Sequence, residues 1–156
     1  MSIYSEKHAL KEAILLAQRS PCFKSQRGVV VFRRGKGYVG GGFNAPPKPF
    51  VCGRNIECTR NCNKLCVHAE QAALLDAERH QYEGPDLELL HVKAVLGHPV
   101  PSGPPSCWQC SRLILERQVG AVWLLHEDGL RSYTAAEFHE ATLRTCGLPI
   151  FGGIVP

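Results

Sequence analysis

Apolar residues recur at helical or strand spacing along most of the chain. Residues 3–19 place apolar side chains three or four positions apart between charged ones, which predicts an amphipathic helix. The run 28–32 is apolar and rich in valine, and the turn 33–37 joins it to residues 38–43, so we expect a β-hairpin. The same patterning predicts further helices at 68–79, 107–118 and 134–144, and further strands at 87–96, 121–125 and 148–151.

The order of these elements favours a sheet covered by helices on both faces. Strands that alternate with helices predict an α/β fold, here a three-layer α/β/α sandwich with a mixed central sheet of about five strands. With no repeat or linker, residues 1–156 are expected to form a single domain. An insert at 45–67, with three prolines and four cysteines, is predicted to be a long loop. The segment 98–106 is expected to be a rigid proline-rich turn.

Composition and charge narrow the class of protein. Hydrophobic residues make up 44% and charged residues 21% of 156 residues, which is typical of a soluble globular protein. The net charge of +4 suits an anionic substrate but is too small to imply a nucleic-acid partner. The start of the chain lacks the pattern of a signal peptide, and no stretch is long enough to span a membrane, so we expect a cytoplasmic protein with no membrane partner. In that compartment eight cysteines favour metal ligation over disulfides.

Two short motifs carry candidate chemistry, each at the start of a predicted helix. The first is His68-Ala-Glu70, and the second is Cys107-Trp-Gln-Cys110. Cysteines three positions apart share one face of a helix, and a helix N-terminus favours the thiolate that a metal needs. Two helix N-termini directed at one point would build a His/Cys/Cys site with a fourth position open, the pattern of a catalytic zinc ion.

Charge balance at such a site gives Glu70 its predicted role. Two thiolates and a neutral imidazole cancel the charge of Zn²⁺, so the metal is a weaker Lewis acid than one held by three histidines. Activation of water at neutral pH would then need a neighbouring base. We therefore predict His68, Cys107 and Cys110 as zinc ligands and Glu70 as the catalytic group that moves protons.

The two motifs together resemble those of the cytidine and deoxycytidylate deaminase superfamily. The order of elements is also similar to that fold over residues 26–150. Gly42-Phe43-Asn44, the run CVHAEQ at 66–71 and the cysteine-containing insert are closest to the deoxycytidylate branch. One departure is Ser106, because the family usually has proline directly before the first cysteine. Ser106 is a candidate N-cap of the following helix.

The resemblance implies a function, a substrate pocket and an assembly. It implies hydrolytic deamination of a cytosine-type nucleotide by water activated at zinc, with Asn44 on the sugar hydroxyl. Ala69 and Trp108 are counted with the substrate-binding residues, Trp108 as a surface on which a base can stack. A homo-oligomer is also implied, and the predicted helices carry apolar residues in excess of what two exposed helices need: Leu74, Leu113, Ile114 and Val119.

Two other functions remain open at this point. A polynucleotide deaminase acting on tRNA adenosine or single-stranded DNA cytosine would need a basic groove with exposed aromatics. The segment 134–156 has only Arg144 as a positive charge, which disfavours it. A non-catalytic, zinc-stabilised binding module is the third possibility, but it has no use for Glu70.

The remaining cysteines and basic residues have more than one interpretation. The insert has four cysteines: Cys52, Cys58, Cys62 and Cys66. One interpretation is that they bind a second, structural zinc ion that holds the insert, and that Cys22 or His91 replaces one of the four as a ligand. The other interpretation is that they are ordinary reduced thiols. The basic turn at 33–36 is interpreted as a solvated hairpin tip rather than a phosphate site.

Overall fold

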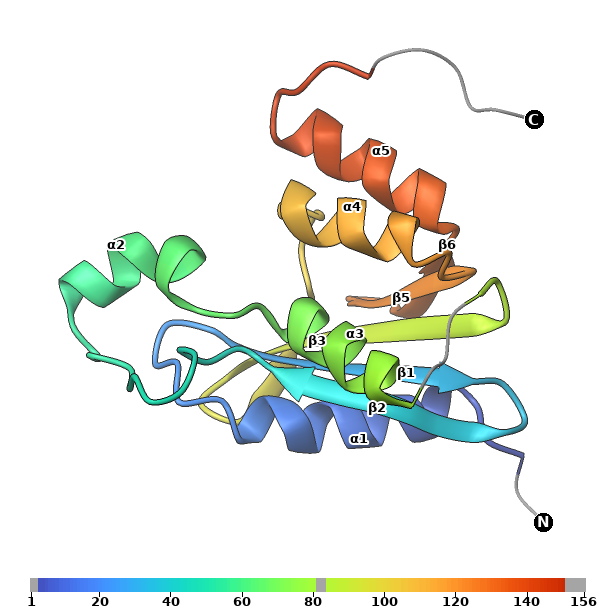
Figure 1. Cartoon of the computed structure of the whole chain (residues 1–156), viewed down its shortest axis with the longest axis horizontal. Helices are drawn as coiled ribbons and strands as arrows, with labels where there is room; N and C mark the ends of the chain where they lie inside the picture. Colours follow the sequence, from blue (N-terminus) through green and yellow to red (C-terminus); the bar gives the residue numbers. More distant parts are fainter. Residues whose placement is uncertain (1–2, 81–83, 151–156) are drawn as a thin grey trace.

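A single mixed β-sheet forms the centre of the molecule. The computed structural model describes residues 3–80 and 84–150. The sheet has strand order β2-β1-β3-β5-β6, with β4 paired to β3 (Figure 1). The β3–β5 pair is parallel, and the other pairs are antiparallel. The strands are β1 (Gln26–Arg33), β2 (Gly37–Phe43), β3 (Leu87–Val95), β4 (His98–Val100), β5 (Ala121–His126) and β6 (Gly129–Tyr133).

Helices cover both faces of this sheet, which confirms the predicted layered α/β fold (Figure 1). Alternate residues of β1 point to opposite faces, as the pleat requires. Val30 and Phe32 pack with α1, whereas Val29 and Val31 join the core beneath α3, α4 and α5. The helices are α1 (Glu6–Gln18), α2 (Ile56–Leu65), α3 (Ala69–Arg79), α4 (Trp108–Glu116) and α5 (Ala135–Thr145).

Glycines let two helices approach the sheet unusually closely. A Cβ atom on Gly28 would lie 2.1 Å from the carbonyl oxygen of Ala13 in α1. On Gly42 it would lie 2.6 Å from the backbone nitrogen of Ala73 in α3, and Gly40 meets the same helix at Ala77. Because any side chain at these positions would push the helices outward, the glycine-rich β2 determines where α3 rests.

The insert contains a helix where the sequence predicted only loop. α2 begins after Asn55, whose side-chain oxygen accepts a hydrogen bond from the Cys58 backbone nitrogen at 2.9 Å. An antiparallel bridge between Ala45 and Val67 brings the two ends of the insert together. The prediction was wrong over α2 because the segment has no apolar stripe at helical spacing, and its single buried residue is Cys58.

Two strands were also missed, and one predicted strand does not form. Leu96 and Gly97, with φ of 50° and 78°, make a tight turn into β4, an edge strand that tolerates a proline. Gly129, with φ of 118°, opens β6 after Asp128, although Asp-Gly is a strong hairpin signal. Over residues 148–150 no strand forms, and residue 151 lies outside the described residues.

The apolar residues that supported an oligomer belong to the core instead. Leu74, Ile114 and Val119 are at most 4% exposed, and Leu113 is partly buried against the same cluster. These positions therefore add no exposed apolar surface of the kind inferred from the sequence, because α3 and α4 pack against the sheet. None of the helices within 3–80 and 84–150 has the length and apolar character needed to cross a bilayer.

Candidate metal centre and active site

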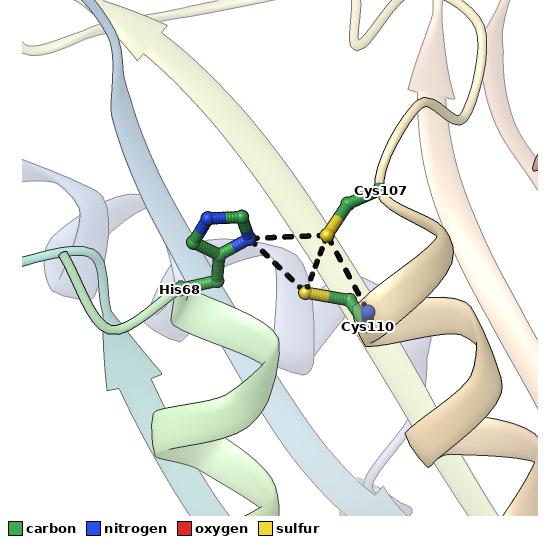
Figure 2. A group of neighbouring side chains, drawn as sticks. All are labelled: His68, Cys107 and Cys110. Carbon is green, nitrogen blue, oxygen red and sulfur yellow. Dashed lines mark hydrogen bonds between the residues drawn. The ribbon is translucent and has the colours of Figure 1, made fainter. Parts of the chain in front are cut away.

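The N-termini of α3 and α4 converge on one point above the sheet (Figure 2). His68 is the N-cap of α3 and Cys107 is the N-cap of α4, so the predicted cap at Ser106 was wrong. The His68 Nδ1 atom lies 3.2 Å from the sulfur of Cys107 and 3.2 Å from that of Cys110. The two sulfur atoms are 3.1 Å apart. The structure thus brings together all three residues predicted as zinc ligands.

Local hydrogen bonds hold these ligands in place. The backbone nitrogen of His68 donates to the side-chain oxygen of Gln71 at 3.1 Å, which fixes the entry into α3. The sulfur of Cys107 accepts from the backbone nitrogen of Cys110 at 3.4 Å, so it serves as the helix cap in place of a hydroxyl. Cys110 is 1% exposed and its sulfur is directed inward from the first turn of α4.

The donor set fits a tetrahedral zinc ion. All three donor atoms lie within 4.8 Å of one another, and they form the only such group of three or more among residues 3–80 and 84–150. Zinc bonds of about 2.3 Å to sulfur and about 2.0 Å to nitrogen imply donor separations of about 3.5–3.8 Å. An ion at the centre needs the donors to move apart by only about half an ångström. Three protein ligands leave the fourth position for water or substrate.

The three donors differ in how readily each one loses its proton. A hydrogen bond from Cys110, together with one from His68, lowers the pKa of Cys107 to about 5, so its thiolate forms readily. The same contact and burial raise the pKa of Cys110 above the ordinary thiol value. The hydrogen bond with Cys107 raises the pKa of His68. Cys107 is thus the donor most readily available as an anion, whereas Cys110 and His68 are shifted toward their protonated forms, so that protons compete with a metal for these two.

Glu70 lies beside these ligands and faces a histidine of the sheet. Its carboxylate Oε1 is 3.7 Å from Nε2 of His91, and the two side chains are 14% and 8% exposed. Burial lowers the pKa of His91 to about 4, so the imidazole is neutral at pH 7. Burial would raise the pKa of Glu70, but His91, a backbone hydrogen bond, His68 and, least of these, Arg27 hold it below the ordinary carboxyl value.

A cavity of about 410 Å³ opens next to these side chains. It is lined by the three candidate ligands, Glu70 and His91, and by all three residues predicted to bind substrate. Trp108 is 39% exposed at the rim, with the guanidinium of Arg112 stacked 5.1 Å from its ring centre. Ala69 is fully buried, so only its main chain and methyl group can meet a ligand.

Asn44 reaches this cavity but is largely engaged by the protein. Its side-chain oxygen accepts hydrogen bonds from the Ser20 hydroxyl and the Arg27 backbone nitrogen, each at 2.7 Å. Its side-chain nitrogen donates to the carbonyl of Ser25 at 2.9 Å, which leaves one N–H for a ligand. Asn44 therefore joins the end of β2 to the segment before β1 and also lines the pocket.

Two pocket residues were missed or misplaced by the sequence interpretation. His91 was a candidate for the cysteine-rich insert, yet it lies on β3 beneath Glu70. Arg27, at the start of β1, lines the pocket and acts electrostatically on Glu70. Both lie on strands, and their contact with residue 70 depends on packing between sheet and helix, which no short motif encodes.

The four cysteines of the insert do not gather into a metal site in this structure. The sulfurs of Cys52 and Cys58 lie 3.4 Å apart, whereas the Cys62 sulfhydryl donates to the carbonyl of Cys58 at 2.9 Å. No three of these sulfurs form a metal-ligand group in the described part of the chain, to which all four residues belong. The second zinc ion stays a prediction.

Comparison with known proteins relates this site to a family. No protein-family model matches the chain. Over 83 residues it is 35% identical to the deoxycytidylate deaminase of Saccharomyces cerevisiae, a match that covers 47% of this chain and 26% of that protein. The chain thus spans about a quarter of the length of this relative.

Solved structures extend the likeness to most of the chain. The dCMP deaminase of cyanophage S-TIM5, in complex with dCMP and dUMP, matches with a TM-score of 0.55 and 25% identity over 73% of this chain and 75% of that one. The fold is that of the cytidine and deoxycytidylate deaminases. A cytidine deaminase from Burkholderia pseudomallei, 17% identical, has the same fold over 86% of this chain and 96% of its own, with a TM-score of 0.60. The resemblance to this deaminase superfamily, expected from the two motifs, is confirmed.

Proposed function

We propose that the protein is a zinc-dependent hydrolase that converts a cytosine-type nucleotide, similar to deoxycytidylate, to the uracil form and releases ammonia. The observation that carries this proposal is the convergence of His68, Cys107 and Cys110 beside the buried Glu70 in one pocket. The resemblance to deaminases that act on dCMP supports the choice of substrate class.

His68, Cys107 and Cys110 are the residues that would hold the metal. A zinc ion bound there supplies Lewis acidity that makes a water molecule a better nucleophile. Two thiolates and a neutral imidazole balance its charge, so the site depends on a nearby base to complete that activation. The thiolate of Cys107, favoured at neutral pH, would be one of the anionic ligands of this ion.

Glu70 carries the protons of the reaction. The water oxygen forms a bond to the ring carbon that bears the amine, and Glu70 accepts the proton that water loses. It passes this proton to the ring nitrogen and then moves the remaining proton of the added hydroxyl to the amine. The carbon–nitrogen bond breaks, ammonia leaves, and the oxygen stays on the ring as the carbonyl of the uracil form. With its pKa held below the ordinary carboxyl value, Glu70 is ionised at pH 7 and able to accept a proton from water, and the neutral His91 beside it at 3.7 Å does not supply that proton.

The geometry favours an enzyme over a zinc-stabilised binding module. Taking a carboxylate out of water has a cost in folding free energy, and a structural zinc site gains nothing from it. Glu70 is 14% exposed, lines the cavity and makes no ion pair with a lysine or arginine among the described residues, and the His91 imidazole beside it is neutral at pH 7. Such a residue is typical of a catalytic site.

Ammonia release from a panel of substrates tests this proposal. Zinc-loaded protein would be incubated with dCMP, CMP, deoxycytidine, cytidine, a single-stranded DNA oligonucleotide and a tRNA anticodon stem-loop. We expect dCMP or CMP to be deaminated with the highest kcat/KM, and chromatography to identify the uracil product. Activity on an oligonucleotide alone would favour the polynucleotide alternative, and no activity on any member would contradict the proposal.

A further inference from the structure

Two thiols of the cysteine-rich insert face each other at close range. The sulfurs of Cys52 and Cys58 lie 3.4 Å apart and share a hydrogen bond. The chain returns to this contact through Gly53, Arg54 and Asn55, and Arg54 has a left-handed φ of 51°, which is uncommon for a residue other than glycine. Because a disulfide bond is about 2.0 Å long, the two sulfur atoms need to approach by less than about 1.5 Å to be joined.

The surroundings of Cys58 stabilise its sulfur as a thiolate. The residue lies in the first turn of α2, where its backbone nitrogen donates to the Asn55 side chain at 2.9 Å. Hydrogen bonds from the backbone of Gly53 and Arg54 reach its sulfur, and the Cys52 thiol is a further donor. Backbone donors at a helix N-terminus favour the thiolate, which is the form of cysteine that attacks a disulfide.

The contact involves two sulfurs and no further metal ligand. The Cys62 sulfhydryl, one turn further along α2, donates instead to the carbonyl of Cys58 at 2.9 Å. Neither Cys52 nor Cys58 belongs to a metal-ligand group of three within residues 3–80 and 84–150. A contact of two sulfurs without a third ligand suits a covalent link better than it suits a metal ion.

The pair lies at the start of a segment that forms one wall of the pocket. Cys58 is 6% exposed, whereas Cys52 is partly exposed and open to a reagent from solvent. Further along α2, Cys62 and Lys64 line the pocket, and Cys66 at the end of the helix does so too. A covalent link at Cys58 would therefore tie the beginning of this wall to the chain that enters it.

We propose that Cys52 and Cys58 form a reversible disulfide, a thiol-oxidation site in the wall of the pocket. The oxidant is a low-molecular-weight disulfide such as glutathione disulfide. The Cys52 thiolate attacks one of its sulfurs and releases one glutathione, and the Cys58 thiolate then attacks the Cys52 sulfur and releases the second. Two protein thiols thus lose two electrons and two protons, and one glutathione disulfide becomes two glutathione thiols. In the oxidised chain the pair is unavailable to a metal, so a second zinc ion is expected only in reduced protein.

Peptide mapping detects this link directly. Trypsin cleaves after lysine and arginine, and cleavage at 54, 60 and 64 places each cysteine of the insert on a peptide of its own. Zinc-loaded protein would be equilibrated with mixtures of reduced and oxidised glutathione, alkylated to trap free thiols and digested. We expect excess glutathione disulfide to join the peptides 37–54 and 55–60, and excess reduced glutathione to separate them again.

Three results of this mapping would overturn the proposal. The two peptides could stay separate at the highest ratio of oxidised to reduced glutathione, Cys58 could be linked to another thiol, or reduced glutathione could fail to reverse the link. Single serine substitutions supply the controls. Cys52→Ser and Cys58→Ser should each abolish the link, whereas Cys66→Ser, in the same insert, should leave it in place.

Hydrogen exchange measures what the link does to the pocket wall. Backbone amides of 55–60 should exchange about 10-fold more slowly in the oxidised wild type, because closing the loop restricts local opening of α2. Those of α1, which is remote from the insert in sequence, should exchange at the same rate in both forms. Equal exchange over 55–60 in the two forms would contradict the effect on the wall. Neither measurement depends on whether the protein deaminates a nucleotide.

Discussion

At the scale of single residues, the donors of the metal centre differ in how easily each one becomes a ligand. Cys107 ionises readily because its sulfur accepts hydrogen bonds at a helix N-terminus, and its pKa falls to about 5. Cys110 and His68 are shifted the other way, toward their protonated forms. Metal binding must therefore displace protons from Cys110 and His68 but not from Cys107.

This asymmetry predicts the number of protons that zinc displaces. At pH 7 we expect binding at the metal centre to release roughly one to two protons, one from Cys110 and a fraction from His68. Zinc affinity should rise with pH. Protons compete with zinc for Cys110 and His68, whose pKa values are raised, and this competition disappears as the two groups deprotonate. Titration calorimetry in buffers of different protonation enthalpy measures the number.

A thiol outside the centre provides the control. Cys146→Ser removes a sulfur that donates to the Ser106 carbonyl and should leave proton release unchanged. Release of close to three protons at pH 7 would show that Cys107 is also protonated in the free protein and would contradict the account.

Sequence and structure agree on the residues that belong to motifs. His68 and Glu70 are two positions apart at one helix start, and Cys107 and Cys110 are three apart at another, so each motif could be recognised from a few neighbouring residues. His91 and Arg27 reach the same pocket from two strands, through the register of β1 against β3 and the packing of α3 above them. A single sequence contains no signal for that register.

At the scale of elements, the position of α3 depends on glycine in β2. The backbone of α3 lies so close to Gly40 and Gly42 that a methyl group there would overlap it. Because α3 begins at His68, any outward shift of this helix moves a metal ligand and the proton carrier together. The sheet thus sets the geometry of the site as well as the stability of the fold.

Substitution of Gly42 by alanine tests this coupling. We expect the free energy of unfolding to fall by about 1–3 kcal/mol through overpacking. We also expect zinc affinity to weaken, because α3 shifts away from Cys107 and Cys110. Chemical denaturation and competition with a chromogenic chelator measure the two effects. Gly53→Ala, in an exposed position where the methyl would meet only the Asn55 side chain, is the control. Equal effects of the two substitutions would count against the coupling.

A second metal site in the cysteine-rich insert remains a prediction. Four cysteines within 15 residues, together with Cys22 close enough to influence their ionisation, suit a structural zinc ion. α2 would need to adjust to bring a third sulfur next to Cys52 and Cys58.

Zinc stoichiometry tests the second site. Elemental analysis should give about two zinc ions per chain, with about one left after Cys58→Ser and Cys62→Ser are combined. Cys107→Ser should remove the other ion, which makes the two variants mutual controls. A wild-type value of one would show that the insert holds no metal.

The elements that sequence analysis missed share a physical reason. α2 has no apolar stripe, and its cysteines were interpreted as possible metal ligands of a loop, although one of them, Cys58, is buried in a helix. β4 and β6 have three and five residues and depend on tight turns and on pairing with a neighbour already in place. The other four helices and the hydrophobic strands, whose own periodicity is strong, were predicted close to where they lie.

At the scale of the whole molecule, a homo-oligomer stays a prediction drawn from the resemblance. Burial of Leu74, Ile114 and Val119 removes the sequence argument for it. Exposed apolar side chains do occur on three helices, at Leu15, Leu75 and Leu115. Light scattering of zinc-loaded, active protein at micromolar concentration should give a multiple of the 17.2 kDa chain. The mass of one chain would contradict the prediction.

The central claim is that Glu70 moves protons beside a zinc ion held by His68, Cys107 and Cys110. Its most direct test is the rate of dCMP conversion to dUMP by wild type and Glu70→Gln, with zinc content measured in the same samples. The account predicts equal zinc at the metal centre and the same unfolding midpoint to within a few degrees, but a kcat lower by about 10²- to 10⁴-fold or more in the variant. A variant that keeps its zinc and turns over within a few-fold of the wild type would contradict the account.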